Sequence, residues 1–252
     1  MENIKHILTE IERKKNIKIL YACETGSRAW GFPSPDSDFD IRFIYKHERD
    51  WYLSLNTKRD TIEIMDGDLD ITGWDFKKSL VLLKKSNAPL IERFNSPITY
   101  FAVDGFEEEF KSLIANYYSP IAVFCHHHSL AKKFWFELKD AEEFKLKSYF
   151  YLIRSLLSCN WIINDDAVLP MEIEGLMKYI DDEYKFRLRE LIKLKATVGE
   201  KYLHKKEDTL HKWITEQFEK IEAAKDGLKH NKSDMRLLNA FFIKNLYEKT
   251  DH

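Results

Sequence analysis

Two aspartates, Asp38 and Asp40, stand two positions apart at the start of an apolar run, and a Gly-Ser dipeptide precedes them. Apolar residues before the dipeptide and after the aspartates predict a strand on each side. Side chains two apart on a strand share one face, so both carboxylates should point to the same place. Two like charges held that close need a cation or a proton between them. The predicted ion is Mg²⁺, because it binds carboxylates and substrate phosphates together.

The dipeptide Gly26-Ser27 has the residue types of a phosphate-binding turn. Glycine lets the backbone turn sharply and approach a ligand, and successive backbone N–H groups in such a turn form a hollow that suits phosphate oxygens. The Ser27 hydroxyl can add a further donor. A solvated loop of turn-forming Asp, Ser and Pro residues is the alternative. The alternation of Asp38 and Asp40 with apolar residues favours the binding site.

Two arginines near these residues each have two interpretations. Arg28 directly follows Ser27 and brings a permanent positive charge, which serves either a phosphate or a neighbouring acid. Arg42 continues the predicted strand face of Asp38 and Asp40. It therefore either steadies a carboxylate or contacts a triphosphate, and the sequence leaves both roles open.

Three longer motifs surround these residues: Gly-Ser-Arg-Ala-Trp-Gly-Phe (26–32), Ser-Pro-Asp-Ser-Asp-Phe-Asp-Ile-Arg-Phe-Ile-Tyr (34–45) and Asp-Leu-Asp-Ile-Thr-Gly-Trp-Asp (68–75). Together they resemble the nucleotidyltransferases of the DNA polymerase beta superfamily. In detail the chain is similar to the bacterial RNA-repair-associated polymerase-beta-like proteins. The resemblance spans roughly the first two thirds of the chain and fades beyond about residue 180.

The resemblance implies a site with three carboxylates on adjacent strands. Asp38 and Asp40 match two of them, and Asp70 fits the third best, with Asp68 as the alternative. It further implies two Mg²⁺ ions, or Mn²⁺ in their place, with Asp38 and Asp40 on the ion that carries the triphosphate and Asp70 specific to the second ion. By the same resemblance, Gly26 and Ser27 would hold the β- and γ-phosphates. Arg28 and Arg42 complete the set of candidate nucleotide-binding residues.

The implied reaction transfers a nucleoside monophosphate from a nucleoside triphosphate, with ATP expected, to an acceptor hydroxyl and releases pyrophosphate. An RNA end is the expected acceptor. The alternatives are a protein or small-molecule acceptor, or a nucleotide- or RNA-binding regulatory or antitoxin-like protein without significant turnover. Lys145, Lys147 and Arg154 lie near aromatic residues and are candidates for acceptor binding; a solvated helix face is the other interpretation of these charges.

Composition sets wider limits. A chain of 252 residues with 44% hydrophobic and 14% aromatic residues can bury a substantial core, which excludes wholesale disorder. Its formal net charge of −2 gives no overall attraction for nucleic acid. No apolar run reaches the ~18 residues of a membrane span, the first residues lack an apolar signal region, and the three scattered cysteines suit a reducing compartment. A cytoplasmic protein is expected, and no pattern predicts an oligomeric state.

The predicted fold class is α+β, of α/β type. Residues 1–115 should form a nucleotidyltransferase domain with a mixed β-sheet and flanking helices, and residues 116–252 an all-helical domain. Apolar spacing predicts a helix before the first strand, strands near 61–65, 68–72 and 98–101, and a helix over about 75–86. Pro89 suits the first turn of another helix. No strand is expected beyond about residue 119, where apolar residues recur at helical spacing.

Overall fold

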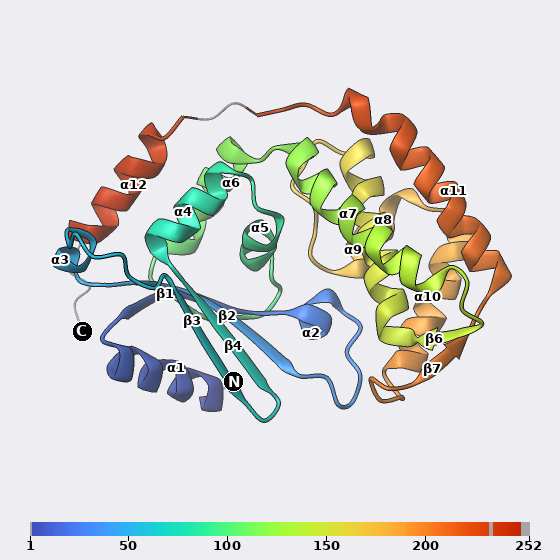
Figure 1. Ribbon diagram of the computed structural model, residues 1–252, viewed down its shortest axis with the longest axis horizontal. Helices are drawn as coiled ribbons and strands as arrows, with labels where there is room; N and C mark the ends of the chain where they lie inside the picture. Colours follow the sequence, from blue (N-terminus) through green and yellow to red (C-terminus); the bar gives the residue numbers. More distant parts are fainter. Residues whose placement is uncertain (1, 232–233, 248–252) are drawn as a thin grey trace. The chain divides into compact units, whose positions relative to one another are not determined.

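The computed structural model describes residues 2–231 and 234–247 (Figure 1). These residues pack into two compact units, the first containing residues 2–26, 38–118 and 234–247 and the second containing residues 27–37 and 119–231. The first unit holds a five-stranded sheet with flanking helices, and the second is mainly helical. This arrangement confirms the predicted α+β class.

The sheet of the first unit has the strand order β3-β4-β2-β1-β5. Its strands are β1 (Lys18–Thr25), β2 (Phe39–Lys46), β3 (Thr61–Asp66), β4 (Leu69–Asp75) and β5 (Thr99–Ala102). The β2–β4 pair is parallel and the other pairs are antiparallel, so the sheet is mixed as predicted. The parallel register sets Asp40 directly beside Asp70.

Helix α1 (Glu2–Lys15) confirms the helix predicted before the first strand. Its apolar side chains Ile4, Leu8 and Ile11 are buried against the sheet residues of one hydrophobic cluster. They recur at helical spacing, so one stripe of the helix meets the sheet while most of its charged residues are in solvent. The same cluster contains buried apolar residues of β1 and β2, so α1 packs against these two strands.

The remaining helices of the first unit are α3 (Arg49–Tyr52), α4 (Phe76–Lys84), α5 (Ala88–Phe94), α6 (Phe106–Tyr117) and α12 (Arg236–Tyr247). Asp75 caps α4 by accepting from the N–H groups of Lys77 and Lys78, and Pro89 lies in the first turn of α5 as predicted. Phe241 of α12 packs against the rings of Phe76 and Phe106. The last described helix therefore belongs to the sheet unit.

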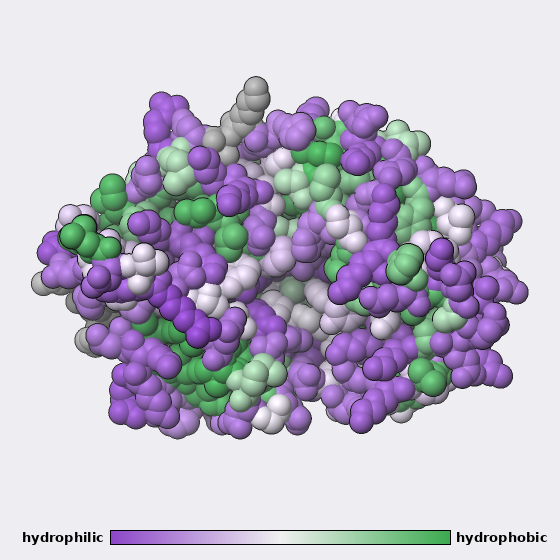
Figure 2. All heavy atoms as spheres, viewed as in Figure 1, coloured by the Kyte–Doolittle hydropathy of each residue, from purple (hydrophilic) through white to green (hydrophobic). Residues whose placement is uncertain are grey.

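The second unit is built on five α-helices beyond residue 119: α7 (Pro120–Leu138), α8 (Leu146–Asn164), α9 (Ile173–Leu176), α10 (Asp182–Lys195) and α11 (Asp208–Ala224). Their visible surfaces in Figure 2 are mainly hydrophilic, with scattered hydrophobic residues. The expectation that this region has no strand is wrong, because β6 (Glu143–Lys145) pairs with β7 (Leu203–Lys205). Each strand has three residues, too few for an alternation to be seen in the sequence.

None of the helices in the described part of the chain combines the length and the apolarity that a membrane crossing needs.

Candidate active site

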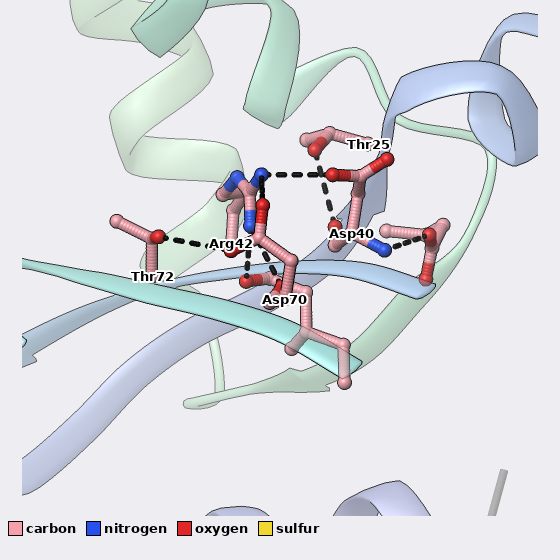
Figure 3. Close-up of polar contacts among 7 residues, drawn as sticks. Thr25, Asp40, Arg42, Asp70 and Thr72 are labelled. Carbon is pink, nitrogen blue, oxygen red and sulfur yellow. Dashed lines mark hydrogen bonds and ion pairs between the residues drawn. The ribbon is translucent and has the colours of Figure 1, made fainter. Parts of the chain in front are cut away.

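The carboxylates of Asp40 and Asp70 meet at one cation, the guanidinium of Arg42 (Figure 3). Arg42 Nη2 lies 2.9 Å from Asp40 Oδ1 and 2.7 Å from Asp70 Oδ2. Two strands bring these groups together: Asp40 and Arg42 are two apart on β2, and Asp70 is the register partner of Asp40 on β4. The result is a pair of acids that share one positive charge.

Arg42 also fixes the backbone beneath this pair. Its Nη1 donates to the carbonyl oxygen of Asp70 at 2.8 Å and to that of Ile41 at 3.2 Å. The side chains of the three charged residues are 17–30% exposed, so solvent screens the ion pairs only in part. Of the two roles that the sequence leaves open for Arg42, the structure contains the ion pair with the carboxylates.

Strand β1 holds the backbone of Asp40 on both sides. The buried Glu24 accepts a hydrogen bond from the N–H of Asp40 at 2.7 Å, and the Thr25 hydroxyl donates to its carbonyl oxygen at 3.1 Å. The second carboxylate oxygen of Glu24 accepts from the Tyr100 hydroxyl. An acid at the end of the apolar run before Gly26 was the available signal for Glu24, which the sequence interpretation missed. These residues position Asp40 through its main chain.

Gly26 touches the Asp40 carboxylate so closely that no other residue fits there. Its φ of +63° is in the left-handed region, and a Cβ built on it would lie 1.9 Å from Asp40 Oδ2. A side chain would therefore meet both backbone strain and the Asp40 carboxylate. The glycine of the Gly-Ser turn is needed for the geometry of Asp40.

The other two predicted carboxylates lie outside the strands. Asp38 is exposed and precedes β2, which begins at Phe39, so strand alternation does not set its direction. Asp68 is exposed in the turn before β4, where its carbonyl oxygen accepts from the N–H of Phe39. Only Asp70 of the two candidates for the third carboxylate has its side chain beside Asp40. The roles of Asp38 and Asp70 as metal ligands stay predictions.

The chemistry of the Asp40–Asp70 pair fits Mg²⁺ or Mn²⁺. Carboxylate oxygens are ligands that both ions favour, and these two oxygens already share one cationic nitrogen atom. Across the described residues, no three acidic, histidine or cysteine side chains lie close enough together to hold a metal by themselves. Mg²⁺ needs fewer protein ligands than that, since water and substrate phosphates usually complete its coordination.

In the second unit, the predicted nucleotide-binding residues Ser27 and Arg28 both contact Ser37. The hydroxyl of Ser27 donates to Ser37 Oγ at 3.0 Å, and Arg28 Nη2 donates to the Ser37 carbonyl oxygen at 2.8 Å. Helix α2 (Gly26–Trp30) carries both residues and begins at the glycine of the turn. The segment 27–37 is thus a closed loop, with its first and last residues hydrogen bonded to each other.

Comparison with known proteins decides the family. The sequence model of the RNA repair pathway DNA polymerase beta family matches residues 1–244. The chain belongs to this family. It is also 38% identical over 231 residues to the uncharacterized protein YcgL of Bacillus subtilis (strain 168), an alignment that covers 90% of this chain and 89% of that protein. The match extends well past the point where the recognisable motifs end in the sequence.

In this polymerase-beta family member, the basic residues predicted for acceptor binding occupy different surroundings within the second unit. Lys145 is exposed on β6, and Lys147 Nζ pairs with Glu200 Oε2 at 2.5 Å. Arg154 is buried, donates to the Met171 carbonyl oxygen from Nε and Nη2, and stacks on Trp30. Arg154 thus has the contacts of a structural residue, while the acceptor role of all three stays a prediction.

Proposed function

We propose that this protein is a Mg²⁺-dependent nucleotidyltransferase. The observation that carries the proposal is the convergence of Asp40 and Asp70 on one cationic position, in a chain whose family is named for polymerase beta and RNA repair. The carboxylates lie on neighbouring parallel strands and are held by a dedicated set of residues, Glu24, Thr25 and Gly26. A side chain whose position is fixed by several neighbours is typical of a catalytic group, which supports a catalytic role for Asp40.

In the proposed reaction an acceptor hydroxyl oxygen attacks the α-phosphorus of the nucleoside triphosphate. The bond from oxygen to phosphorus forms, the bond from the α-phosphorus to the bridging oxygen breaks, and pyrophosphate leaves with the electron pair, while the hydroxyl proton passes to solvent. Mg²⁺, when bound, would neutralise phosphate charge and acidify the attacking hydroxyl. Asp38, Asp40 and Asp70 would hold it, and Asp70 would matter more for the chemical step than for nucleotide binding.

The remaining residues would bind and orient the donor. Gly26 exposes its backbone at the turn, Ser27 supplies a hydroxyl, and Arg28 adds positive charge for the phosphates. Arg42 would steady the carboxylates before the ion binds and would then be available to the triphosphate. Catalysis in this class rests on positioning and charge neutralisation, which suits a site made of acids, a turn and arginines.

The family name favours RNA as the acceptor class, and we propose an RNA hydroxyl end with ATP as the donor. A protein or a small molecule is the alternative acceptor within the same chemistry. The alternative to an enzyme is a nucleotide- or RNA-binding protein without turnover. The intact Asp40–Arg42–Asp70 arrangement favours the enzyme, because a binding protein has no need of paired carboxylates that repel phosphate.

Label transfer tests the proposal. Each α-³²P-labelled nucleoside triphosphate is incubated with Mg²⁺ and the protein, with total RNA, total protein or no added acceptor. We expect label in the RNA pool with the wild type and with Asp66→Asn, an exposed acid on β3, and none with Asp40→Asn. Label in no pool, despite Mg²⁺-dependent triphosphate binding, would favour a nucleotide-binding protein; equal label with Asp40→Asn would overturn the site.

A further inference from the structure

The loop 27–37 of the second unit is closed by one serine hydroxyl. Ser37 Oγ accepts from the Ser27 hydroxyl at 3.0 Å and from the Ser34 N–H at 2.9 Å. Its own proton is donated to Glu200 Oε1 at 3.1 Å. All three serines are buried. The hydroxyl therefore uses both of its acceptor positions within the loop and directs its one donor outward, to a carboxylate.

Glu200 is bound in the manner of an anionic ligand. One carboxylate oxygen accepts from Ser37, and the other accepts from the ammonium of Lys147 at 2.5 Å. The backbone N–H of Glu200 donates to Asp36 Oδ1 at 2.9 Å, which holds the residue against the loop by its main chain. A hydroxyl donor and a lysine ammonium are the groups that commonly bind phosphate oxygens.

A second lysine next to this cluster, Lys195, is buried, and no carboxylate oxygen of the described residues lies within ion-pair distance of its ammonium. The side chain of Lys195 is only 1% exposed, and its Nζ donates to Ser34 Oγ at 2.7 Å. No ion pair involves Lys195 in the part of the chain that the structure describes. A buried charge is costly unless it is paired. Burial lowers the pKa of Lys195, while the nearby Glu200 and Asp36 carboxylates raise it in part, and an anion in the place of Glu200 would do the same.

We infer that this cluster is a polyphosphate subsite and that Glu200 occupies the position of a phosphate group. Ser37 and Lys147 would bind the phosphate directly, and Lys195 would add positive charge through Ser34. The ligand class is the polyphosphate tail of a nucleoside triphosphate. The inference rests on the proposed function for that ligand and adds Ser37, Lys147, Lys195 and the displaceable Glu200 to the turn residues.

The hydrogen bonds permit this exchange without rearranging the loop. A carboxylate and a phosphate are both acceptors when ionised, so the Ser37 hydroxyl and the Lys147 ammonium would donate in the same directions to either. The Ser34 N–H would keep its bond to Ser37, while the Ser27 hydroxyl, which donates to Ser37 in this structure, would turn to the phosphates. Glu200 thus competes with the ligand, and the affinity for polyphosphate equals the gain from the phosphate contacts minus the loss of the Glu200 contacts.

Calorimetric binding of inorganic tripolyphosphate, in Mg²⁺-free buffer, tests the subsite on the full chain. We expect Glu200→Gln to bind about tenfold more tightly than the wild type, because the competing charge is removed and its neutral amide binds Lys147 less strongly. Lys147→Met should bind about tenfold more weakly. The matched controls are Glu183→Gln and Lys193→Met, which change exposed residues of α10 and should bind as the wild type does. Circular dichroism establishes that each variant is folded.

Unchanged affinity in folded Glu200→Gln would overturn the inference, since it would make Glu200 a clamp of the loop rather than a competitor of phosphate. Failure of tripolyphosphate to bind either the wild type or Glu200→Gln would overturn it as well. These results are separate from those of label transfer. Transfer with no effect of Glu200→Gln on triphosphate affinity would refute the subsite alone, and tight tripolyphosphate binding without transfer would refute the proposed reaction alone.

Discussion

The two units each contain a charged group held by side chains of the opposite sign. In the sheet unit, the cation Arg42 lies between the carboxylates of Asp40 and Asp70. In the helical unit, the anion Glu200 lies between a serine hydroxyl and a lysine ammonium. Under the two proposals above, the first arrangement would mark a position for a positive ligand and the second a position for a negative one. In both, binding would exchange a side chain for a ligand, so each affinity would be a difference between two sets of contacts.

The comparison predicts its largest effect where the sheet unit loses a carboxylate. Asp40→Asn and Asp70→Asn should each lower the rate of nucleotidyl transfer by at least about 10³-fold, several kcal/mol of transition-state stabilisation. Asp70→Asn should keep most of its nucleotide affinity, measured by calorimetry with Mg²⁺-ATP. Asp66→Asn is the control on β3 and should retain the wild-type rate. Full activity of Asp70→Asn would transfer the third-carboxylate role to Asp68.

The next effect comes from the glycine that touches Asp40. Gly26→Ala should lower the transfer rate by about 10²-fold, because the new Cβ displaces the Asp40 carboxylate. Gly67→Ala separates backbone strain from this clash, since Gly67 has a φ of +55° but no atom near an added Cβ. Both variants should lose about 1–2 kcal/mol of unfolding free energy, measured by urea denaturation. Equal activity of the two would show that the contact with Asp40 is unimportant.

A smaller effect is expected on replacing Arg42, the side-chain cation at the position proposed for Mg²⁺. Arg42→Gln should lower the Mg²⁺ concentration needed for half of the thermal stabilisation by about tenfold, because no guanidinium then competes for Asp40 and Asp70. Differential scanning fluorimetry over a Mg²⁺ series measures this midpoint. Arg42→Lys keeps the charge and should stay near the wild type. An unchanged midpoint in Arg42→Gln would show that Arg42 does not compete with Mg²⁺ in the way that Glu200 is proposed to compete with phosphate.

The smallest effect is a dependence on pH in the helical unit. Burial lowers the pKa of the Lys195 ammonium below its ordinary value of 10.5. Tripolyphosphate affinity should therefore be full below this lowered pKa and should fall as the pH rises through it, at a lower pH than an exposed lysine would give. Lys195→Arg should move the decline to higher pH, because the guanidinium stays charged there, and Lys193→Arg should leave it unchanged. The same pH profile in the wild type, Lys195→Arg and Lys193→Arg would show that Lys195 does not contribute to anion binding.

The parts of the site that follow from local pattern could be predicted from the sequence. Asp40 alternates with apolar residues on a strand, and Gly26 stands where a turn needs it, so residue type and spacing indicated both. Asp70 also alternates with apolar residues, but its choice as the third carboxylate depended on the resemblance to a family. The parallel register that joins Asp40 to Asp70 came only through the resemblance to a family. Asp38 shows the limit of alternation, because β2 begins one residue after it.

The parts that depend on distant pairing could not be predicted. Glu24 matters because of its cross-strand bond to the Asp40 N–H, and nothing in its own neighbourhood indicates that partner. Glu200 and Ser37 are 163 positions apart in the chain. Arg154 looks like a surface cation in the sequence but is buried, because its long side chain packs on Trp30 and finds a backbone carbonyl.

The stoichiometry of pyrophosphate release tests the central claim most directly. Pyrophosphate and labelled acceptor are measured together for the wild type, Asp40→Asn and Asp66→Asn, with Mg²⁺, α-³²P-ATP and RNA. We predict one pyrophosphate for each labelled RNA end in the wild type and Asp66→Asn, and neither product in Asp40→Asn. Pyrophosphate or labelled RNA formed at the wild-type rate by folded Asp40→Asn would contradict the assignment of the reaction to the Asp40–Arg42–Asp70 site.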